Sequence, residues 1–506
     1  MTATAHTAIA TAINSQTKTL VRCGVATRVA TTVLAVASLA ACAQFEHATD
    51  TRSPMTPQAF GARAEWAAWP DERWWTRFND PHLTQLIERA LADNPDLRVA
   101  SSRIARAQAA VDVANAGFRP NVDANARSVR QRFSENDIYP PPIGGATVTL
   151  NSAALEGRWE FDFFGRQRAA LDAALGERAA ALADQQAARV LLAARVAQTH
   201  IELAHAIELR AVAQATREQR QRIRDLVADR VRAGLDTRVE LRQAEGAVPQ
   251  TTQDIEALDE RIAVTRHALA ALIGAGPDAT NDLAPVLDRV QAQPLPDAIP
   301  ADLVGRRADV SAARARVEAA TAGVAGARAA FYPNINLAAM AGFASVGFGD
   351  WFRAGSRTFS VGPAISLPIF EGGRLRAALR AQSAQAEAAV ASYDATLIDA
   401  VREVADAIDA VRSVDRQQTA QREAQAAAES AYALAEQRYR AGLGTFLSVL
   451  SAETAVLTQR RGAVDLRARA LTAQIELIRA LGGGYQPPAQ DLARTASIST
   501  SASESR

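Results

Sequence analysis

Two histidines five positions apart form the arrangement in this chain that comes nearest to a metal site. His200 and His205 enclose the sequence His-Ile-Glu-Leu-Ala-His, one residue longer than the zinc-binding motif of helical metalloproteases. Positions i and i+5 of a helix point about 140° apart, so the two imidazoles cannot bind one ion. The other histidines are scattered, and the sequence has no phosphate-binding loop or nucleotide fingerprint. We therefore predict no enzyme activity, no metal and no cofactor.

Asp236 and Glu240 are the other side chains to which chemistry could be assigned. Both follow Gly234 in a predicted turn between two helices. In a ring of several chains, their carboxylates could surround an aperture and favour cations. Capping of the next helix and plain exposure to solvent explain the same residues equally well. The sequence leaves these alternatives open.

The segment that holds these acids occurs twice. Arg-Val-Arg-Ala-Gly-Leu-Asp-Thr ends at Thr237, and Arg-Tyr-Arg-Ala-Gly-Leu-Gly-Thr, which contains Tyr439, ends at Thr445. Their glycines, Gly234 and Gly442, lie 208 positions apart (442 − 234). A Pro-Asn pair recurs in a similar way nearer the start of each half, so we interpret the chain as a tandem duplication. A helical turn without function would explain one such tip, but the tip occurs twice.

Each half contains a long stretch without proline that begins at a Gly-Arg pair and ends at the tip glycine. Both stretches span 69 positions (234 − 165 and 442 − 373). At about 1.5 Å per residue they predict helices roughly 100 Å long, which must line up in a tube or a bundle. Gly234 and Gly442 are predicted to end these helices. Asp236 or Thr237, and in the second half Thr445, are predicted to start the return helices.

The N-terminus carries the features of an export signal. Basic residues precede an apolar stretch from Val29 to Ala41, whose thirteen residues are short for a membrane helix. The stretch ends in Leu-Ala-Ala-Cys, which resembles a bacterial lipobox with Cys42 as the acylated first residue of the mature chain. An ordinary cleavage site beside a cysteine is the alternative. A covalent lipid on Cys42 is the one attached group that we expect, and by resemblance to bacterial lipoproteins Ala43 favours the outer membrane.

Charge and hydropathy narrow the class of protein further. The 56 Lys and Arg residues balance 55 Asp and Glu residues, so no basic field exists to attract nucleic acid. Nothing after Ala41 is long and apolar enough to cross a bilayer as a helix. A mature chain that spans a membrane must therefore do so with the strands of a closed barrel.

Four segments alternate between apolar and polar residues, as strands with two different faces do. In the clearest, Leu155 to Phe163, an aromatic face opposes a charged one, which suits lipid outside a barrel and water inside. A half-buried strand of a soluble sheet alternates in the same way, but two such strands per half in an exported protein favour the barrel. The predicted lipid-facing residues are Leu155, Trp159, Phe161, Phe163, Ile335, Leu337, Ile365 and Leu367. Four strands cannot close a barrel, for which about eight are needed, so several chains must share one.

These observations divide the chain into six parts. We predict a lipoprotein signal peptide (1–41), a lipid-anchored segment (42–80), repeat 1 (81–274), a linker (275–300), repeat 2 (301–483) and a disordered tail (484–506). Each repeat should contain a helix, two barrel strands, a long helix and a return helix in that order. In repeat 1, we expect the first helix over 81–117, end to end with the return helix and beside the long one.

Several motifs together resemble one family, the TolC-type outer-membrane factors. Within it they resemble the lipoprotein, NodT-like branch that serves resistance-nodulation-division (RND) efflux systems. The motifs are Trp75-Thr-Arg-Phe-Asn-Asp-Pro-His-Leu83, Arg306-Arg-Ala-Asp-Val310, Phe331-Tyr-Pro-Asn334, Pro368-Ile-Phe-Glu-Gly-Gly-Arg374 and the two tips. They extend from about Trp74 to Gly483, and as a set they are specific.

The resemblance implies a mostly α-helical chain with a transmembrane β part. Three identical chains would form a twelve-stranded β-barrel continued by a long α-helical barrel, with the linker in an equatorial belt. The homotrimer would be a passive duct that exports drugs or other toxic small molecules. An inner-membrane RND-type pump and a periplasmic adaptor would deliver them. The implied location is the bacterial outer membrane, with a lipid anchor, lipid around the barrel, and helices extending into the periplasm.

The same resemblance suggests roles at the tips, which would form the closed entrance of the duct. Tyr439 matches a position that often helps to hold the tip closed in relatives. Ser448 and Ser451 stand where some relatives have aspartates around the aperture, which leaves Asp236 and Glu240 as candidates for that charge. The predicted tip or gate residues are Gly234, Asp236, Thr237, Glu240, Tyr439, Gly442 and Thr445.

Two other functions fit part of this pattern. A type I protein-secretion duct would have the same fold and a different inner-membrane partner, although the lipobox argues against it. A periplasmic helical adaptor or scaffold without a pore would explain the helical hairpins but not the four alternating strands.

Overall fold

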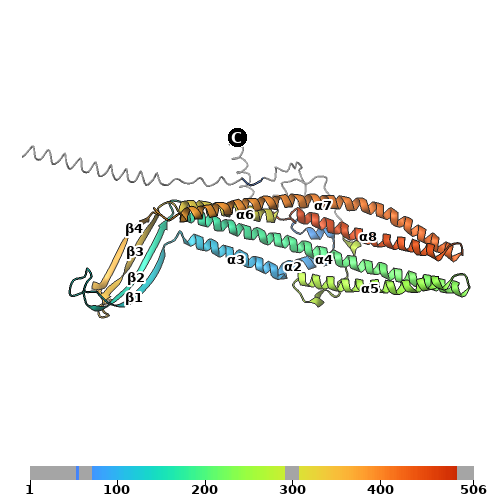
Figure 1. The fold of residues 1–506 in the computed structure, drawn as a ribbon, viewed down its shortest axis with the longest axis horizontal. Coiled ribbons are helices and arrows are strands. Elements are labelled where there is room, and N and C mark those ends of the chain that lie inside the picture. The colour runs from blue at the N-terminus through green and yellow to red at the C-terminus, as the bar shows by residue number, and fades with distance from the viewer. Residues whose placement is uncertain (1–52, 56–70, 291–306, 487–506) are drawn as a thin grey trace, which may run out of the picture. The chain divides into compact units, whose positions relative to one another are not determined.

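The computed structural model of the chain describes residues 53–55, 71–290 and 307–486 (Figure 1). The predicted signal peptide, the predicted lipidation site Cys42 and nearly all of the predicted tail lie outside these residues. Among the helices that the structure describes, none is both long enough and apolar enough to cross a membrane.

The described residues are mostly helical, as predicted, and a series of one helix, two strands, a long helix and a return helix occurs twice, with the additional helix α2 (Pro81–Asp93) before the first series. The first series is α3 (Pro95–Ala116), β1 (Asn121–Arg132), β2 (Thr147–Phe161), α4 (Arg166–Arg232) and α5 (Arg238–Leu272). The second is α6 (Ala308–Ala329), β3 (Asn334–Val346), β4 (Arg357–Ser366), α7 (Arg374–Arg440) and α8 (Phe446–Ala480). Short 3-10 turns accompany them: η2 (Trp74–Phe78), η3 (Pro277–Thr280), η4 (Leu287–Arg289) and η6 (Ala354–Ser356).

The long and return helices of the two halves coincide residue for residue. α4 and α7 have 67 residues each, and α5 and α8 have 35 each. Each boundary of α7 and α8 lies 208 positions after the corresponding boundary of α4 and α5 (374 − 166, 440 − 232, 446 − 238, 480 − 272). At about 1.5 Å per residue, α4 and α7 are roughly 100 Å long. Neither long helix contains a proline, and alanine, the best helix former, is the commonest residue in both.

The prediction of one helix over 81–117 is wrong, because the helix breaks at Asn94. Pro95 has no backbone N–H and disfavours a helical residue before it, and Asn94 is extended, with φ −63° and ψ 128°. The Asn94 side chain accepts a hydrogen bond from the Asp96 amide at 2.8 Å and donates one to the Leu272 carbonyl at 2.9 Å. α3 therefore begins where α5 ends, and the two lie end to end beside α4.

The four strands form one antiparallel sheet in the order β1-β2-β3-β4. Residues directly opposite each other on neighbouring strands share a face of the sheet. The predicted apolar residues of β2, β3 and β4 share one face, as these pairs demonstrate: Trp159 with Leu337, Phe161 with Ile335, and Ile335 with Ile365. The charged residues between them in β2 project from the opposite face, so the sheet has one apolar and one polar side.

Two of the predicted lipid-facing residues lie beyond the ends of their strands, which corrects the predicted extents of the strands. β2 ends at Phe161, and Phe163 lies in the turn before α4, where its amide donates to the Phe161 carbonyl at 3.0 Å. β4 ends at Ser366, so Leu367 also follows its strand. The next residue, Pro368, has no N–H with which to continue the ladder.

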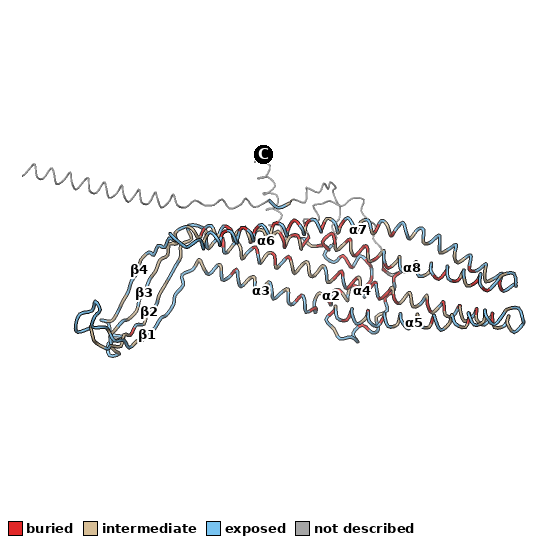
Figure 2. The backbone as a smooth tube through the Cα atoms, in the orientation of Figure 1, coloured by how far each residue is buried: buried red, intermediate tan, exposed pale blue. Residues whose placement is uncertain are grey.

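The helices lie side by side and continue from the sheet (Figure 1). Near the sheet α3, α4, α6 and α7 are neighbours in that order, and toward the tips the order is α5, α4, α8 and α7. Buried residues follow the facing sides of the helices, whereas the strands are mostly exposed or half-buried (Figure 2). The largest core lies midway, where Trp74 and Phe78 of η2 and Leu83 and Ile87 of α2 pack against α4, α5 and α8.

Candidate functional site

The helical turns at the far ends of α4 and α7 have the same backbone geometry. Gly234 and Gly442 adopt φ values of 74° and 73°, a conformation that residues with a Cβ rarely adopt. The amide after each glycine donates to the carbonyl four residues before that glycine, at 2.9 Å in the first tip and 2.8 Å in the second. This bond satisfies a carbonyl at each helix end, so both glycines end their helices as predicted.

A threonine starts each return helix. Thr237 accepts a hydrogen bond from the amide two residues ahead at 3.1 Å, and Glu240 accepts one from the Thr237 amide at 3.0 Å. Together they form a capping box, so Thr237 rather than Asp236 is the cap of α5. In the second tip, Thr445 accepts from the Ser448 amide at 3.4 Å.

Three side chains join the first tip to the second, and we call them the tip lock. Arg230 of α4 donates to Asp236 through Nε at 2.8 Å and through Nη2 at 3.3 Å. Its Nη1 donates to the backbone carbonyl of Tyr439 in α7 at 3.1 Å, and its Cζ lies 4.5 Å from the centre of the Tyr439 ring. The Tyr439 hydroxyl donates to the Asp236 carboxylate. Tyr439 is fully buried, and the side chains of Arg230 and Asp236 are each only 12% exposed.

Each ionisable group of the tip lock is held in the protonation state that its hydrogen bonds require. The hydrogen bond from Arg230 lowers the pKa of Asp236 below its usual value, so the carboxylate stays ionised. Burial raises the pKa of the Tyr439 phenol well above its usual value, and the hydrogen bond to Asp236 raises it further. At neutral pH the tip lock therefore consists of one ionised acceptor and two donors.

The tip lock is built once, although the tip occurs twice. Arg438 stands at the position of Arg230, but Gly444 stands at that of Asp236. Arg438 donates instead to a backbone carbonyl of its own tip, at 3.4 Å. Sequence reasoning named Asp236 and Tyr439 but missed Arg230, for which the recurrence of arginine in both tips is the available signal.

A second polar layer joins α4, α5 and α8 behind the tips, and sequence reasoning did not find it. Glu453 of α8 accepts a hydrogen bond from Gln219 at 3.3 Å and lies 3.4 Å from Nε of Arg220. Arg220 also donates to the Thr251 hydroxyl of α5 at 2.8 Å. Glu453 is buried, and this burial raises its pKa.

Neither candidate acid for a charged aperture is free within one chain. Asp236 is bound in the tip lock, and the carboxylate of Glu240 caps the first turn of α5. The contacts favour pairing for Asp236 and helix capping for Glu240 over a free charge at an aperture.

The apolar face of the sheet is exposed in the single chain. Leu155, Trp159 and Ile365 expose 57%, 38% and 68% of their surface. Trp159 also donates from its indole nitrogen to the Phe118 carbonyl at 3.0 Å, which fixes the ring at the end of the sheet nearest the helices. Within the described residues, β1 and β4 each have a neighbour on one side only. The sheet is therefore apolar on one face and open at both edges.

His200 and His205 interact with different partners. His200 Nε2 lies 2.8 Å from Asp80, whose carboxylate also caps α2, and His205 Nε2 lies 2.6 Å from Asp465. In the part of the chain that the structure describes, no group of three or more His, Cys, Asp or Glu residues could hold a metal ion.

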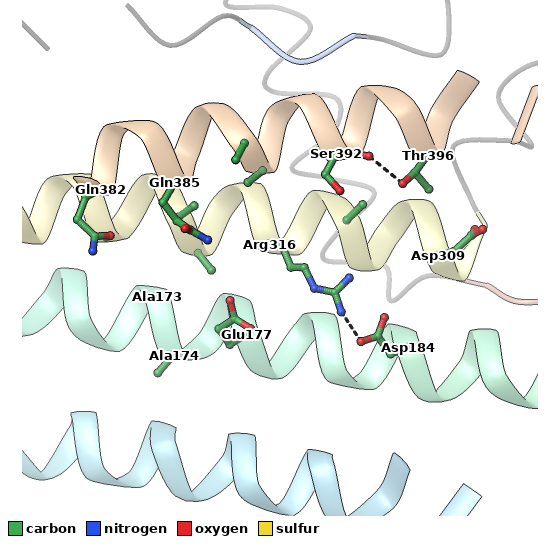
Figure 3. A pocket seen from close by; sticks show the side chains of 16 residues that line it. Ala173, Ala174, Glu177, Asp184, Asp309, Arg316, Gln382, Gln385, Ser392 and Thr396 are labelled. Carbon is green, nitrogen blue, oxygen red and sulfur yellow. Dashed lines mark hydrogen bonds and ion pairs between the residues drawn. The ribbon is translucent and has the colours of Figure 1, made fainter. Parts of the chain in front are cut away.

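A cavity of about 650 Å³ lies between α4, α6 and α7 (Figure 3). Alanines form much of its wall, and their small side chains leave the space open. Its charged lining consists of Glu177 and Asp184 of α4 and Asp309 and Arg316 of α6, with Arg316 and Asp184 joined as an ion pair. The sequence did not predict this cavity, and its lining forms no catalytic arrangement.

Comparison with known proteins gives a consistent family match. The model of the outer membrane efflux protein family matches residues 86–275 and 299–483, one match in each half. The chain is 38% identical over 322 residues to the fusaric acid resistance protein FusA of Burkholderia cepacia. That match covers 63% of this chain and 61% of the relative.

Two further relatives match over most of both lengths. The multidrug resistance outer membrane protein MdtP of Escherichia coli is 30% identical over 429 residues, which cover 83% of this chain and 88% of MdtP. The pyoverdine export outer membrane protein OpmQ of Pseudomonas putida is 31% identical over 422 residues, which cover 83% of this chain and 89% of OpmQ.

Solved structures have the same fold. The outer membrane protein VceC of Vibrio cholerae is 34% identical, with a TM-score of 0.78, over 83% of this chain and all of VceC. The outer-membrane channel OprN is 29% identical, with a TM-score of 0.79, over 87% of this chain and 98% of OprN.

Proposed function

This chain belongs to the outer membrane efflux protein family and is a passive outer-membrane channel rather than an enzyme, and we propose that three copies build one duct. Each copy would contribute four strands to a twelve-stranded barrel and its helices to a tube through the periplasm. The duct would export small toxic molecules, in line with the drug, fusaric acid and pyoverdine in the names of its relatives.

The observation that carries this proposal is the sheet. It has one apolar face, exposed in the single chain, and unpaired edges at β1 and β4 among the described residues. An open edge within lipid would leave backbone N–H and C=O groups without partners, at a cost of several kcal/mol each. Pairing β4 of one copy with β1 of the next would remove every edge, and three copies would exceed the minimum of about eight strands.

The helices support the second half of the proposal. α4 and α7 leave the sheet and run roughly 100 Å to the tips without interruption. A ring of three copies would place these helices side by side in a wall that continues the barrel. The cavity between α4, α6 and α7 is then a recess of that wall.

We propose that the tip lock holds the periplasmic entrance of the duct closed. It joins the end of α4 to the end of α7, so separating the two tips would break the Tyr439 contacts of Arg230 and Asp236. An RND-type pump and a periplasmic adaptor are the proposed partners, and adaptor binding at the tips would shift the equilibrium toward the open state. The predicted acylation of Cys42 would add a lipid anchor in the outer membrane.

Electron microscopy of the full chain, purified in detergent from the outer-membrane fraction, tests the proposal. We expect a three-fold tube with a stalk of about 100 Å, the length set by the helical rise. Compact monomers without a tube would contradict the shared barrel. Co-purification with an adaptor and an RND-type pump, as opposed to a protein-secretion transporter, identifies the system that the duct serves.

A further inference from the structure

Toward the tips, the chain forms a layer of four helices with two free edges. α5 packs on α4, α4 on α8, and α8 on α7. Figure 1 shows α7 and α5 at the two margins of this layer. Each edge helix therefore has an in-chain neighbour on one side only among the described helices.

The middle of this layer is a seam between the two halves of the chain, where α4 meets α8. Arg467 of α8 lies at the centre of a charged group on this seam, 2.9 Å from Glu208 of α4 and 2.6 Å from Asp288 of η4. The α4–α8 seam thus carries an acid on the long helix and a base on the return helix.

The duplication predicts how a second copy of the chain would extend the layer of four helices. α7 is the counterpart of α4, and α5 is the counterpart of α8, with the same offset of 208 at every helix boundary (374 − 166, 446 − 238). A second copy that adds to the free edge therefore brings its α5 against α7 in the way that α8 packs against α4. The helix lengths are equal, so the register of the in-chain seam carries over to this α7–α5 seam.

At the corresponding positions of the α7–α5 seam, both charges are reversed: the long helix carries a base and the return helix carries an acid. The counterpart of Glu208 is Arg416 (208 + 208), and the counterpart of Arg467 is Asp259 (467 − 208). We propose that Arg416 of one copy pairs with Asp259 of the next copy, and that this pair fixes the register between subunits. The proposal rests on the proposed oligomeric duct.

The surroundings of both residues fit this pairing. Arg416 is exposed and makes no ion pair with the described residues of its own chain. Asp259 is 40% exposed and is held in place by Arg210, whose Nη2 donates to it at 3.2 Å. The next copy's Arg416 would complete an Arg-Asp-Arg group, the charge-reversed counterpart of the in-chain group around Arg467.

The charge reversal also opposes incorrect assembly. If α7 of one copy met α8 of another in this register, Arg416 would face Arg467, and like charges disfavour such a contact. The other polar links of the α4–α8 seam do not transfer as pairs. The counterpart of Arg220 is Ala428, and the counterpart of Asp465 is Ala257. Neither of these links can therefore form at the α7–α5 seam, whereas the counterparts of Glu208 and Arg467, which are Arg416 and Asp259, still carry opposite charges.

Cross-linking of the full-length protein in intact outer membranes tests the pairing. The variant Arg416→Cys/Asp259→Cys is treated with a short bismaleimide and resolved on a denaturing gel. We expect covalent dimers and trimers, because each link joins two chains. The matched in-chain pair Glu208→Cys/Arg467→Cys should react without forming covalent oligomers.

Two controls make the result specific. Gln418→Cys/Asp259→Cys should give no covalent oligomers, because Gln418 donates to the Leu466 carbonyl at 3.4 Å and so faces α8 of its own chain. The single cysteine variants report any background from native cysteines. Monomers after cross-linking of Arg416→Cys/Asp259→Cys, with a trimer still seen by light scattering, would overturn the pairing and leave the proposed duct standing. A wild-type protein that is monomeric in light scattering would overturn both.

A charge exchange gives an independent readout. Arg416→Glu should lower the temperature at which the trimer dissociates in detergent, because two acids then face each other. Adding Asp259→Arg should restore most of the loss. If the double variant is no more stable than Arg416→Glu alone, the two residues do not meet.

Discussion

The hydroxyl of Tyr439 donates a hydrogen bond to Asp236, although the two residues lie 203 positions apart in different halves of a duplicated chain. Arg230 binds both of them, so one guanidinium connects the end of α4, its own tip and the end of α7. The second tip lacks the acid needed to repeat the arrangement. Duplication thus produced two similar tips, and differences between the copies produced one contact that joins them.

We expect Tyr439→Phe to open the duct more often. The substitution keeps the buried ring but removes the donor to Asp236, and a hydrogen bond to a charged group contributes about 1.5–3 kcal/mol. Since about 1.4 kcal/mol corresponds to a factor of ten, the open fraction should rise at least about tenfold. Single-channel conductance in planar bilayers measures this fraction.

Tyr432→Phe is the matched control for this experiment. Tyr432 is also buried in α7, but its hydroxyl has no hydrogen-bond partner among the residues that the structure describes. Its removal should leave the conductance unchanged. Equal effects of the two variants would indicate that ring packing, and not the hydrogen bond, holds the tips together.

The tip lock should be insensitive to pH across the physiological range. The pKa of Asp236 is lowered, so its stabilising effect is present above its ordinary value of about 3.9 and is lost as pH falls through the lowered value. The pKa of Tyr439 is raised, so its effect is present below about pH 10 and is lost as pH rises through the raised value. We expect a constant open fraction between about pH 5 and 9.

Conductance recorded over this pH range, for the wild type and for Asp236→Asn, checks the expectation. The variant should be more open throughout, because Arg230 loses its charged partner. A steep change of the wild type between about pH 6 and 8 would contradict this expectation and show that a titrating group outside the tip lock controls the open fraction.

Adjacent residues of β4 give a direct test of which sheet face meets lipid. Val361 lies on the apolar face opposite Ala339, whereas Ser360 lies on the polar face opposite Met340. Val361→Lys should reduce the amount of trimer in the outer membrane, since a lysine facing lipid costs up to about 2–4 kcal/mol, depending on depth. Ser360→Lys places the same charge at nearly the same depth and should be tolerated. Equal loss in both variants would contradict the assignment of the faces.

The helices could be predicted from the sequence because their causes are local. Stretches without proline set the length of α4 and α7, and Gly234 and Gly442 mark their ends. The break at Asn94 could also have been predicted from the sequence, because Pro95 disfavours a helical residue before it. The prediction of one helix over 81–117 did not take this into account. Alternation gave the faces of the strands correctly.

Other features depend on information that no local pattern contains. Alternation does not mark where a strand stops, which is why Phe163 and Leu367 were placed in the sheet although both follow strand ends. The contact of Arg230 with Tyr439 joins residues more than two hundred positions apart. Spacing within one tip could suggest a pair of Arg230 and Asp236, but only the packing of both α4 and α7 against α8 brings Tyr439 to them.

Asp80 should be the side chain whose loss most loosens the attachment of α2 to α4. Its carboxylate accepts from the amides of His82 and Leu83 at 2.9 and 3.2 Å, and from His200 at 2.8 Å. Asp80→Ala removes a helix cap, worth about 1 kcal/mol, and leaves the fully buried His200 without this partner, at about 1–3 kcal/mol. Thermal unfolding of the purified protein should therefore begin at a lower temperature.

Asp80→Asn separates the two contributions. An asparagine still caps a helix well, and it can accept one hydrogen bond from His200, but it carries no charge. We expect it to recover the cap and part of the contact with His200, so its unfolding temperature should lie between those of Asp80→Ala and the wild type. If both variants unfold at the wild-type temperature, α2 is held by the packing of Leu83 and Ile87 in the central core rather than by Asp80.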